Sequence, residues 1–385
     1  MSGLVPGNDV RLLRNGTEYF PALEKAIDDA REEVYLESYI FEADEAGEQV
    51  GGALQRAAIR GVSTHLLIDG FGSRNFPKAC IAAMERAGVE VLLYRPETVH
   101  PWLMRHRLRR LHRKLCVVDA KVGFIGGINI IHDLHTPGHK PPRYDYAVRI
   151  EGPVVAEIQR VVRRLWAVVT WSQLKERRRP KNWGKLDAAL HGGQTAQLIV
   201  RDNLRHRRDI EQAYLGAIDN AKNEILIASP YFLPGLNFRR SLVNAAARGV
   251  RVILLLQARV EYVLMHFASR ALYGAFLDAG VEIWHYHKSF MHAKVAVIDR
   301  AWATVGSSNI DPFSLLLARE ANLVIEDERF ARELRADLER AVAEGATRVF
   351  REGWRKQPLH TRIITWLSYG LSRLMTGIGY GWGRE

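Results

Sequence analysis

Short apolar runs alternate with longer segments of helical periodicity along most of the chain. Six runs rich in Val, Ile and Leu stand out in the second half: Glu224–Ser229, Val250–Gln257, Val281–Tyr286, Ala293–Asp299, Trp302–Gly306 and Ala321–Glu326. Segments with apolar residues at a spacing near 3.6 lie between the first three runs. Strands that alternate with helices indicate βαβ units. The pattern therefore predicts an α/β fold with mainly parallel sheets covered by helices on both faces.

The same pattern occurs twice. The segment Arg60–Asp69 recurs as Arg248–Gln257, and the longer segment Leu111–Asn129 recurs as Met291–Asn309. Self-similarity in a fixed order indicates a duplicated domain. We expect a first repeat over residues 1–170, a basic connector over 171–200, a second repeat over 201–350 and an appended tail over 351–385.

Composition and charge narrow the function. The 385 residues, 47% apolar and 25% charged, exclude a disordered chain, and two cysteines exclude a disulfide framework. The net charge of +12 predicts an anionic partner such as a phosphodiester, nucleic acid or an anionic membrane. The first residues lack the apolar core of a signal peptide, and no uninterrupted apolar stretch is long enough to span a bilayer. We expect a protein of the cytoplasm, free or bound to a surface.

The strongest signal is a twice-repeated motif, H-x-K-x4-D, followed by a glycine-containing turn and an asparagine. Its residues are His112, Lys114, Asp119, Gly126, Gly127 and Asn129 in the first copy, and His292, Lys294, Asp299, Gly306, Ser307 and Asn309 in the second. Side chains two positions apart on a strand share a face, so each histidine projects with its lysine. Glycine lets the backbone approach a ligand closely, and Ser307 adds a hydroxyl donor.

This set of residue types suits phosphoryl chemistry without a metal. One histidine can attack phosphorus while the other protonates the departing oxygen. Lysines and asparagines can hold the non-bridging oxygens, a task that a metal ion performs elsewhere. A single H-x-K pair would be no more than a solvated strand edge, but two copies in the same layout indicate a site.

On these residues the sequence resembles the phospholipase D superfamily, whose HKD motif is this pattern. The resemblance covers residues 10–345 and includes the segments Leu36–Phe41, Ala228–Gly235, Tyr144–Pro153 and Val305–Leu315. Within the superfamily the layout is similar to bacterial cardiolipin synthases of the B type. The resemblance implies two α/β/α repeats related by a pseudo-twofold axis, with the active site at their interface and no cofactor or metal.

The resemblance also implies roles for the site residues. The six HKD residues form the catalytic set, with His112 as the nucleophile and His292 as the general acid and base. The motif aspartates Asp119 and Asp299 resemble residues that brace the turn. Each histidine needs a carboxylate on its far nitrogen. Asp145, 33 residues after His112, and Glu320, 28 residues after His292, match the family's positions for these partners. For each acid, an ordinary strand-edge charge is the alternative.

Three other features carry weaker signals. His132, His135 and His139 have a spacing that could hold zinc, although a substrate loop fits their Gly/Pro-rich surroundings better. The run Arg105–Lys114 holds six Arg or Lys residues beside His112, and we expect it to contact an anionic lipid or nucleic acid. The alternative for this run is a solvated face.

The tail has the pattern of an amphipathic helix. Apolar residues (Ile363, Leu367, Leu371, Leu374 and Ile378) form one stripe, and small polar residues (Thr365, Ser368, Ser372 and Thr376) form the opposite stripe. Arg362 and Arg373 interrupt the apolar run, so the helix should lie in the membrane interface and not span it. The alternative is a terminal helix packed on the protein's own core.

The leading functional hypothesis is a phosphatidyl transferase that makes cardiolipin from two phosphatidylglycerol molecules and releases glycerol. It would act on anionic phospholipids as a peripheral enzyme at the cytoplasmic face of the cell membrane. Hydrolysis of phospholipids is an alternative, and a nuclease is a weaker one because aromatic residues are not interleaved with the basic runs. A non-catalytic anion-binding scaffold is a third alternative, disfavoured by two complete motifs.

Overall fold

A computed structural model gives the structure of the chain. It describes residues 3–96, 110–173, 190–202, 206–259, 263–311, 314, 318–355 and 357–379, without the side chains of 355 and 375–379. The first half contains the elements β1 (Val5–Arg14), α1 (Asn15–Asp28), β2 (Glu33–Ser38), α2 (Glu45–Ile59), β3 (Ser63–Asp69), α3 (Lys78–Arg86), β4 (Glu90–Tyr94), β5 (Lys114–Val118), β6 (Val122–Gly126), β7 (Arg143–Tyr144), β8 (Tyr146–Glu151) and α4 (Val155–Ser172).

The second half follows a similar order. It contains β9 (Gln194–Arg201), α5 (Asp209–Asn220), β10 (Glu224–Ser229), α6 (Leu236–Ala247), β11 (Arg251–Gln257), α7 (Val263–Arg270), α8 (Tyr273–Asp278), β12 (Glu282–Tyr286), β13 (Phe290–Met291), β14 (Val295–Ile298), β15 (Trp302–Gly306), β16 (Glu320–Glu326) and α10 (Glu328–Gly345). The elements β17 (Ala346–Val349), α11 (Arg351–Arg355) and α12 (Leu359–Gly379) follow. The second half differs from the first in having two helices before β12 and in placing β13 before the motif hairpin β14–β15. Strand β9 begins inside the range expected to be connector, because its apolar residues join the sheet.

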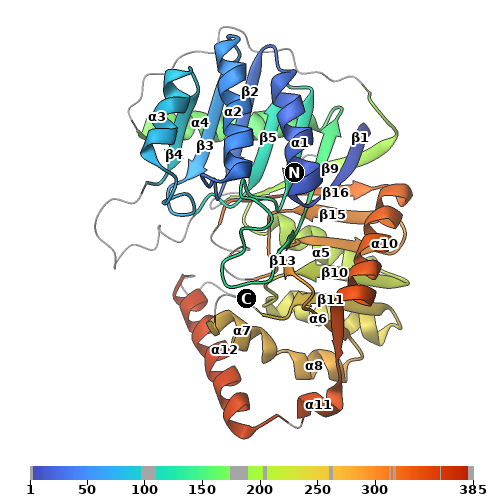
Figure 1. Cartoon of the computed structure of the whole chain (residues 1–385). Coiled ribbons are helices and arrows are strands. Elements are labelled where there is room, and N and C mark those ends of the chain that lie inside the picture. Colours follow the sequence, from blue (N-terminus) through green and yellow to red (C-terminus); the bar gives the residue numbers. More distant parts are fainter. Residues whose placement is uncertain are drawn as a thin grey trace.

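Among the described residues, fifteen strands form one sheet in the order β17-β12-β11-β10-β14-β15-β16-β9-β1-β8-β6-β5-β2-β3-β4. The order reads nearly the same from either end, as a duplicated domain requires, and the pair β1–β9 joins the halves (Figure 1). The α/β class is confirmed, but the expectation of mainly parallel sheets is wrong. Parallel pairing in this sheet is confined to β2–β3–β4 and β10–β11–β12, because the motif strands form hairpins, β5–β6 and β14–β15.

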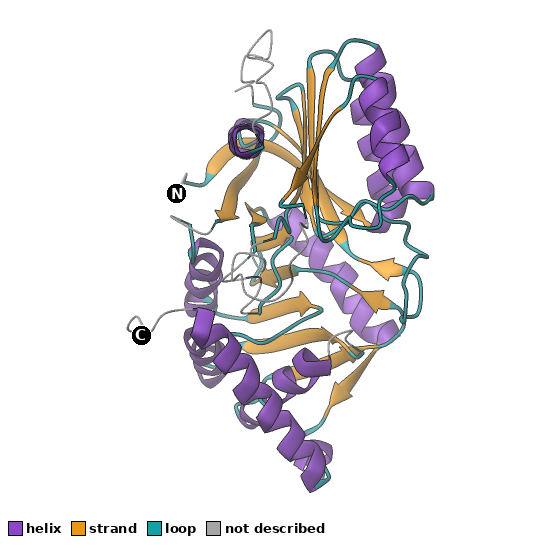
Figure 2. Ribbon diagram, turned by 90° about the vertical axis from the view of Figure 1, so that its left-hand side faces the viewer, coloured by secondary structure: helices purple, strands orange, loops and turns teal. Residues whose placement is uncertain are grey.

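Helices cover both faces of this sheet (Figure 2). Alternate residues of a strand face opposite sides, so Leu115 and Val117 of β5 join a core with α4 and α10, while Cys116 and Val118 join a core with α1 and α2. The first of these cores contains strands of both halves and therefore fixes one half against the other. Among the described helices, none is both long and apolar enough to cross a membrane.

Candidate active site

The two HKD segments lie at the carboxyl ends of parallel strands. Lys114 begins β5, which runs antiparallel to β2, so the histidine–lysine pair lies beside the end of β2. The equivalent segment enters β14 beside the end of β10. In open α/β sheets this edge is where ligands bind, because the loops that follow the strands surround it. The duplicated motif therefore occupies the ligand-binding edge of each half.

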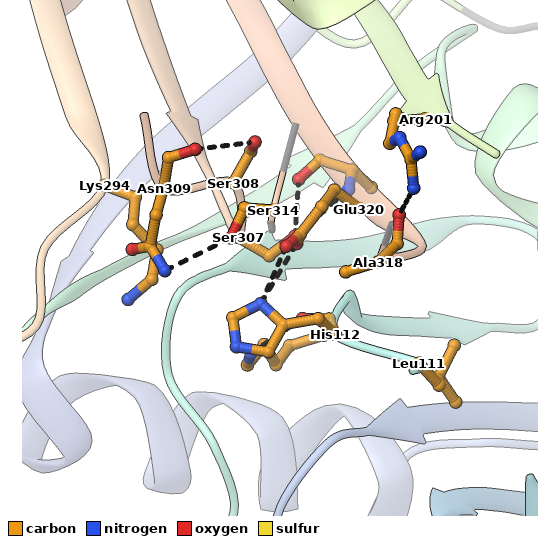
Figure 3. Close-up of polar contacts among 12 residues, drawn as sticks. Leu111, His112, Arg201, Lys294, Ser307, Ser308, Asn309, Ser314, Ala318 and Glu320 are labelled. Carbon is orange, nitrogen blue, oxygen red and sulfur yellow. Dashed lines mark hydrogen bonds and ion pairs between the residues drawn. The ribbon is translucent and has the colours of Figure 1, made fainter. Parts of the chain in front are cut away.

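His112 of the first half contacts Glu320, the first residue of β16 in the second half. Its Nδ1 lies 3.1 Å from Glu320 Oε2 and 2.9 Å from Oε1, and Ser307 Oγ donates to the same Oε2 at 2.5 Å (Figure 3). The Glu320 side chain is fully buried, whereas 17% of the His112 side chain is exposed. The carboxylate favours the tautomer with the proton on Nδ1, which leaves the lone pair of Nε2 for chemistry.

His292 has the corresponding contact with Asp145. Its Nδ1 lies 2.6 Å from Asp145 Oδ2, and Lys294 Nζ lies 3.8 Å from the same oxygen. The backbone N–H of Tyr146 donates to Asp145 Oδ1 at 2.8 Å. A Cβ at Gly127 would stand 2.3 Å from Oδ1, so a glycine is required where the turn passes this carboxylate.

Each carboxylate thus serves the histidine of the other half. This corrects the pairing that sequence spacing suggested, in which Asp145 would serve His112 and Glu320 would serve His292. Backbone hydrogen bonds hold this crossed pairing in place: His112 N donates to Arg319 O at 3.0 Å, and His292 N donates to Tyr144 O at 2.8 Å. Each histidine is therefore held beside the residue that precedes the opposite acid, and each half-site contains side chains from both halves.

The motif lysines are buried beside the histidines, with 3% and 1% of Lys114 and Lys294 exposed. Lys114 Nζ donates to His112 O at 2.6 Å, and Lys294 Nζ donates to His292 O and lies 2.8 Å from His292 Nδ1. Two buried cations next to the histidines make a site that attracts a phosphodiester anion.

The motif aspartates lie at the opposite ends of their strands from the lysines, away from the two histidines. Asp119 accepts hydrogen bonds from the backbone N–H groups of Arg31, Glu32 and Glu33, at 2.8–2.9 Å. Asp299 accepts the equivalent bonds from residues 222–224. Both adopt positive φ, 51° and 52°, at the hairpin turn. They tie that turn to the start of the neighbouring strand.

The asparagines are buried at the site edge, and their bonds differ. Asn129 Oδ1 accepts a hydrogen bond from Ile40 N at 3.1 Å, whereas Asn309 Nδ2 donates to Ser314 Oγ at 3.3 Å. The segment before Glu320 is tied to β9, because Arg201 Nη1 donates to Ala318 O (Figure 3). Both asparagines are therefore held by the loops that form the edge of the site.

Burial controls the protonation of the histidines. It lowers the pKa of His112, and the charge of Glu320 opposes this effect. It lowers the pKa of His292 well below its usual value, with the positive charges of Lys294 and Arg143 adding to the effect. A bound phosphodiester is negative and favours the protonated form of both rings.

Burial also changes the other ionisable groups of the site. It lowers the pKa of Lys114 to about 7 and that of Lys294 to about 8, against the opposing charges of the two carboxylates. It raises the pKa of Asp145 to about 6, although Lys294 acts in the opposite direction. Titrations this close to neutrality at clustered groups are typical of functional sites.

Comparison with known proteins identifies the family. The model for "Cardiolipin synthase, PLD-like domain" matches residues 23–166 and 214–342, one segment in each half. The chain belongs to this PLD-like family. Cardiolipin synthase B of Escherichia coli K12 is 38% identical over 348 residues, which are 88% of this chain and 81% of that protein. The minor cardiolipin synthase ClsB of Bacillus subtilis is 29% identical over 95% of this chain and 89% of that protein.

The fold of this chain is also similar to that of a solved structure. Phosphatidylserine synthase of Haemophilus influenzae superposes with a TM-score of 0.69 at 14% identity, over 95% of this chain and 93% of that one. The overall fold is therefore shared with a protein of very different sequence.

Two side chains at this PLD-like site were not predicted from the sequence. The ring centroid of Tyr39, just after β2, lies 4.9 Å from that of His112 and 5.5 Å from Lys114 Nζ. Arg143 is buried and its positive charge acts on Asp145 and His292. Tyr39 belongs to a segment that resembles the family, but nothing in its spacing marks it as a neighbour of His112.

The contacts of the three histidines in the His132–His139 loop are now defined, and the substrate-loop role expected for them stays a prediction. His132 and His135 face the carboxylates of Glu45 and Asp44 at 3.5 and 3.6 Å, and His139 stacks on Phe290. Within the described part of the chain, no group of three His, Cys, Asp or Glu side chains is arranged to hold a metal.

The basic run Arg105–Lys114 is only partly described, since residues 105–109 lie outside the described residues. In the remaining part, Arg110 pairs with buried Asp69 at 2.7 Å, and Arg113 forms a buried ion pair with Glu37. These two arginines anchor the segment before β5, so they are not available to a lipid or nucleic acid. The expected contact with an anionic partner is wrong for them.

Proposed function

We propose that the protein is a phosphatidyl transferase in which His112 becomes covalently bound to the phosphatidyl group. In the first step, His112 Nε2 attacks the phosphorus of phosphatidylglycerol. A P–N bond forms, the P–O bond to the glycerol head group breaks, and His292 gives its proton to the departing oxygen. Glycerol leaves, and the phosphatidyl group remains on His112.

In the second step the head-group hydroxyl of another phosphatidylglycerol attacks the same phosphorus. His292 takes the proton of that hydroxyl, a new P–O bond forms, and the P–N bond to His112 breaks. The product is cardiolipin, and both histidines return to their initial states. One site handles both substrates in turn because each displacement passes through the same covalent intermediate.

The contact of Glu320 with His112 supports the choice of His112 as the nucleophile. The ring acquires positive character when it bonds to phosphorus, so it needs an ionised carboxylate on Nδ1. Glu320 accepts hydrogen bonds from both His112 and Ser307, so its carboxylate is held against that nitrogen. Lys114, Lys294, Asn129 and Asn309 hold the non-bridging oxygens.

The single observation that carries the proposal is the pair of crossed His–carboxylate contacts, which supports a reaction that uses both imidazoles. The similarity to curated cardiolipin synthases over most of the chain supports phosphatidylglycerol as donor and acceptor. We also propose that the enzyme acts as a peripheral protein at the cytoplasmic face of the membrane, which the two free thiols, Cys80 and Cys116, support.

The test is to incubate the purified full-length protein with detergent-dispersed phosphatidylglycerol and to identify the products by mass spectrometry. We expect cardiolipin and glycerol in equal amounts. Phosphatidic acid as the main product would instead indicate hydrolysis, because water differs from an alcohol only in its access to the phosphohistidine. Cleavage of DNA without lipid turnover would overturn the proposal in favour of a nuclease.

A further inference from the structure

The terminal helix α12 packs against α7 with its polar stripe inward. Thr365 and Ser372 are 4% and 1% exposed, and Tyr369, between them, packs on the second-half core. The guanidinium of Arg239 in α6 lies 5.9 Å from the centre of the Tyr369 ring. An ordinary surface helix buries its apolar stripe, so α12 is inverted. The alternative of a terminal helix packed on the protein's own core is therefore correct for the polar stripe, but the apolar stripe does not take part in that packing.

The apolar stripe of α12 therefore faces outward. We call it the α12 apolar face; its described residues, each between 43% and 69% exposed, are Leu359, Ile363, Ile364, Trp366, Leu367, Leu371 and Leu374. Val263, at the start of α7, is also 69% exposed. Soluble monomers seldom expose so many large apolar side chains side by side, and such a surface marks an interaction site. Ile378 and Trp382 lie outside the described side chains.

The charges around this face select among possible partners. The sequences of α7 and α12 contain no Asp or Glu, whereas Arg362 and Arg373 of α12 are basic and exposed. Apolar residues flanked by basic ones complement an anionic lipid surface. A twofold contact with a second copy of the chain would instead bring basic residues against basic residues, because both partners present the same surface.

The face also lies on the half of the molecule that carries His292. Strand β11 ends at Gln257, whose Oε1 accepts a hydrogen bond from Met291 N, at 2.9 Å, immediately before His292. Helix α7 follows β11, and α12 lies along α7 at the outer side of the second half (Figure 1). A bilayer bound at the α12 apolar face would therefore lie next to α7, the helix that follows β11, and β11 ends beside the segment of His292.

We propose that the α12 apolar face docks into the interfacial region of an anionic phospholipid bilayer. Trp366 and the leucines enter the boundary between head groups and acyl chains, and the arginines contact lipid phosphates. The inference rests on the proposed function only in that a lipid substrate requires contact with a bilayer. It assigns a surface to that contact.

The test compares full-length variants in flotation with vesicles of phosphatidylglycerol and phosphatidylcholine. The double variant Leu367→Asp/Leu371→Asp changes the α12 apolar face. The matched control Ile59→Asp/Trp171→Asp changes two residues of the first half that are 74% and 75% exposed. We expect the face variant to bind about 100-fold more weakly, because two leucines no longer leave water and two negative charges repel the surface. The control should bind like the wild type.

Turnover on detergent-dispersed phosphatidylglycerol separates this inference from the proposed function. The face variant should retain wild-type turnover there, since neither leucine belongs to the catalytic site. If the wild-type protein made no cardiolipin in detergent, the proposed function would be contradicted. The flotation experiment would still show whether the α12 apolar face binds the bilayer. Equal flotation of the face variant and the wild type would overturn the docking. So would a change from dimer to monomer with unchanged flotation, which would assign the face to self-association.

Fluorescence of Trp366 gives a second test that does not require charged substitutions. Phosphatidylglycerol with brominated acyl chains should quench a component of the wild-type emission, and that component should be absent from Trp366→Phe. Equal quenching in both proteins would place Trp366 outside the bilayer and contradict the docking. Quenching should also be weaker with brominated phosphatidylcholine alone, because that surface has no net negative charge to attract the arginines. High salt should weaken quenching as well, because it screens this attraction.

Discussion

The two half-sites share a backbone design and differ in the side chains that hold the carboxylates. In one, Asp145 accepts a backbone hydrogen bond from Tyr146 and packs against Gly127, where no side chain fits. In the other, the longer Glu320 accepts a hydroxyl hydrogen bond from Ser307, the residue equivalent to Gly127. The duplicated positions thus support two different acids, each serving the histidine of the opposite half.

The shared features are those that hold the loops. Ser38 and Ser229 each donate to the carbonyl oxygen two residues further on, at 2.6 and 2.8 Å. The residue that follows differs, because Tyr39 lies beside His112 whereas the second half has Pro230. The comparison teaches that the duplication preserves the scaffold and that its side chains diverge around the two histidines. Two similar histidines can therefore take unequal roles.

The largest expected effect tests whether the two histidines act as a unit. His112→Ala and His292→Ala should each lower kcat by a factor on the order of 10⁵–10⁶, because neither displacement proceeds without both a nucleophile and an acid. The double variant should be no worse than either single variant. Kinetics on detergent-dispersed lipid measure this, and substantial turnover in one single variant would refute the two-histidine mechanism.

The crossed carboxylates can be tested next. Glu320→Gln and Asp145→Asn should each lower kcat by about 10³–10⁴, because the wrong tautomer of the partner histidine is favoured. Histidine NMR assigns the partners. Glu320→Gln should lower the pKa of His112 further, since the charge of Glu320 raises it, and should leave His292 nearly unchanged. The opposite pattern would show that each acid serves its own half.

The lysines should have a smaller effect. Lys114→Ala and Lys294→Ala should each lower kcat by about 10²–10³, as the loss of one preorganised donor does. Chelators should not alter the chemical step, because side chains supply the positive charge. Loss of activity with EDTA that zinc restores would instead assign a metal to the site.

The pH profiles should show a shift between the free enzyme and the lipid complex. Burial and nearby cations lower the pKa of His292, the proposed general acid, and burial lowers that of Lys114 to about 7. Activity should fall as pH rises through these values, because both groups act in the protonated form. A bound phosphodiester raises both, so kcat should fall at higher pH than kcat/KM does. Coincident profiles would contradict this account of the site.

The motif aspartates should affect stability and not chemistry. Asp119→Ala and Asp299→Ala should each lower the free energy of unfolding by about 1–3 kcal/mol, because backbone N–H groups lose their acceptor. Denaturant unfolding measures this loss. The kcat of the folded variants should remain near the wild-type value, and a loss comparable to that of the lysine variants would return the aspartates to the catalytic set.

Much of this structure could be predicted from the sequence because the signals are local. The six apolar runs of the second half are strands, and the repeated motif contains both histidines and both lysines of the site. The relative direction of neighbouring strands was harder to predict. The short turn between Ala293–Asp299 and Trp302–Gly306 permits only an antiparallel hairpin, but the alternation of helices and strands elsewhere favoured a parallel sheet.

The relationships between the halves could not be predicted, since no local pattern encodes them. The spacing of Asp145 and Glu320 along the chain gave each acid to the wrong histidine, because the packing of two pseudo-symmetric halves decides the pairing. The roles of Arg110 and Arg113 were missed for the same reason, as their carboxylate partners are distant in sequence. A basic run beside a site can be internal scaffolding.

The central claim is that one histidine carries the phosphatidyl group while the other transfers protons. The most direct measurement is to quench the full-length protein during turnover of phosphatidylglycerol and to map the phosphorus-linked residue by peptide mass spectrometry under conditions that preserve phosphohistidine. The account predicts an adduct on His112 alone, absent from His112→Ala. An adduct on His292 would reverse the roles of the two half-sites, and the absence of any adduct during demonstrated turnover would contradict the covalent mechanism.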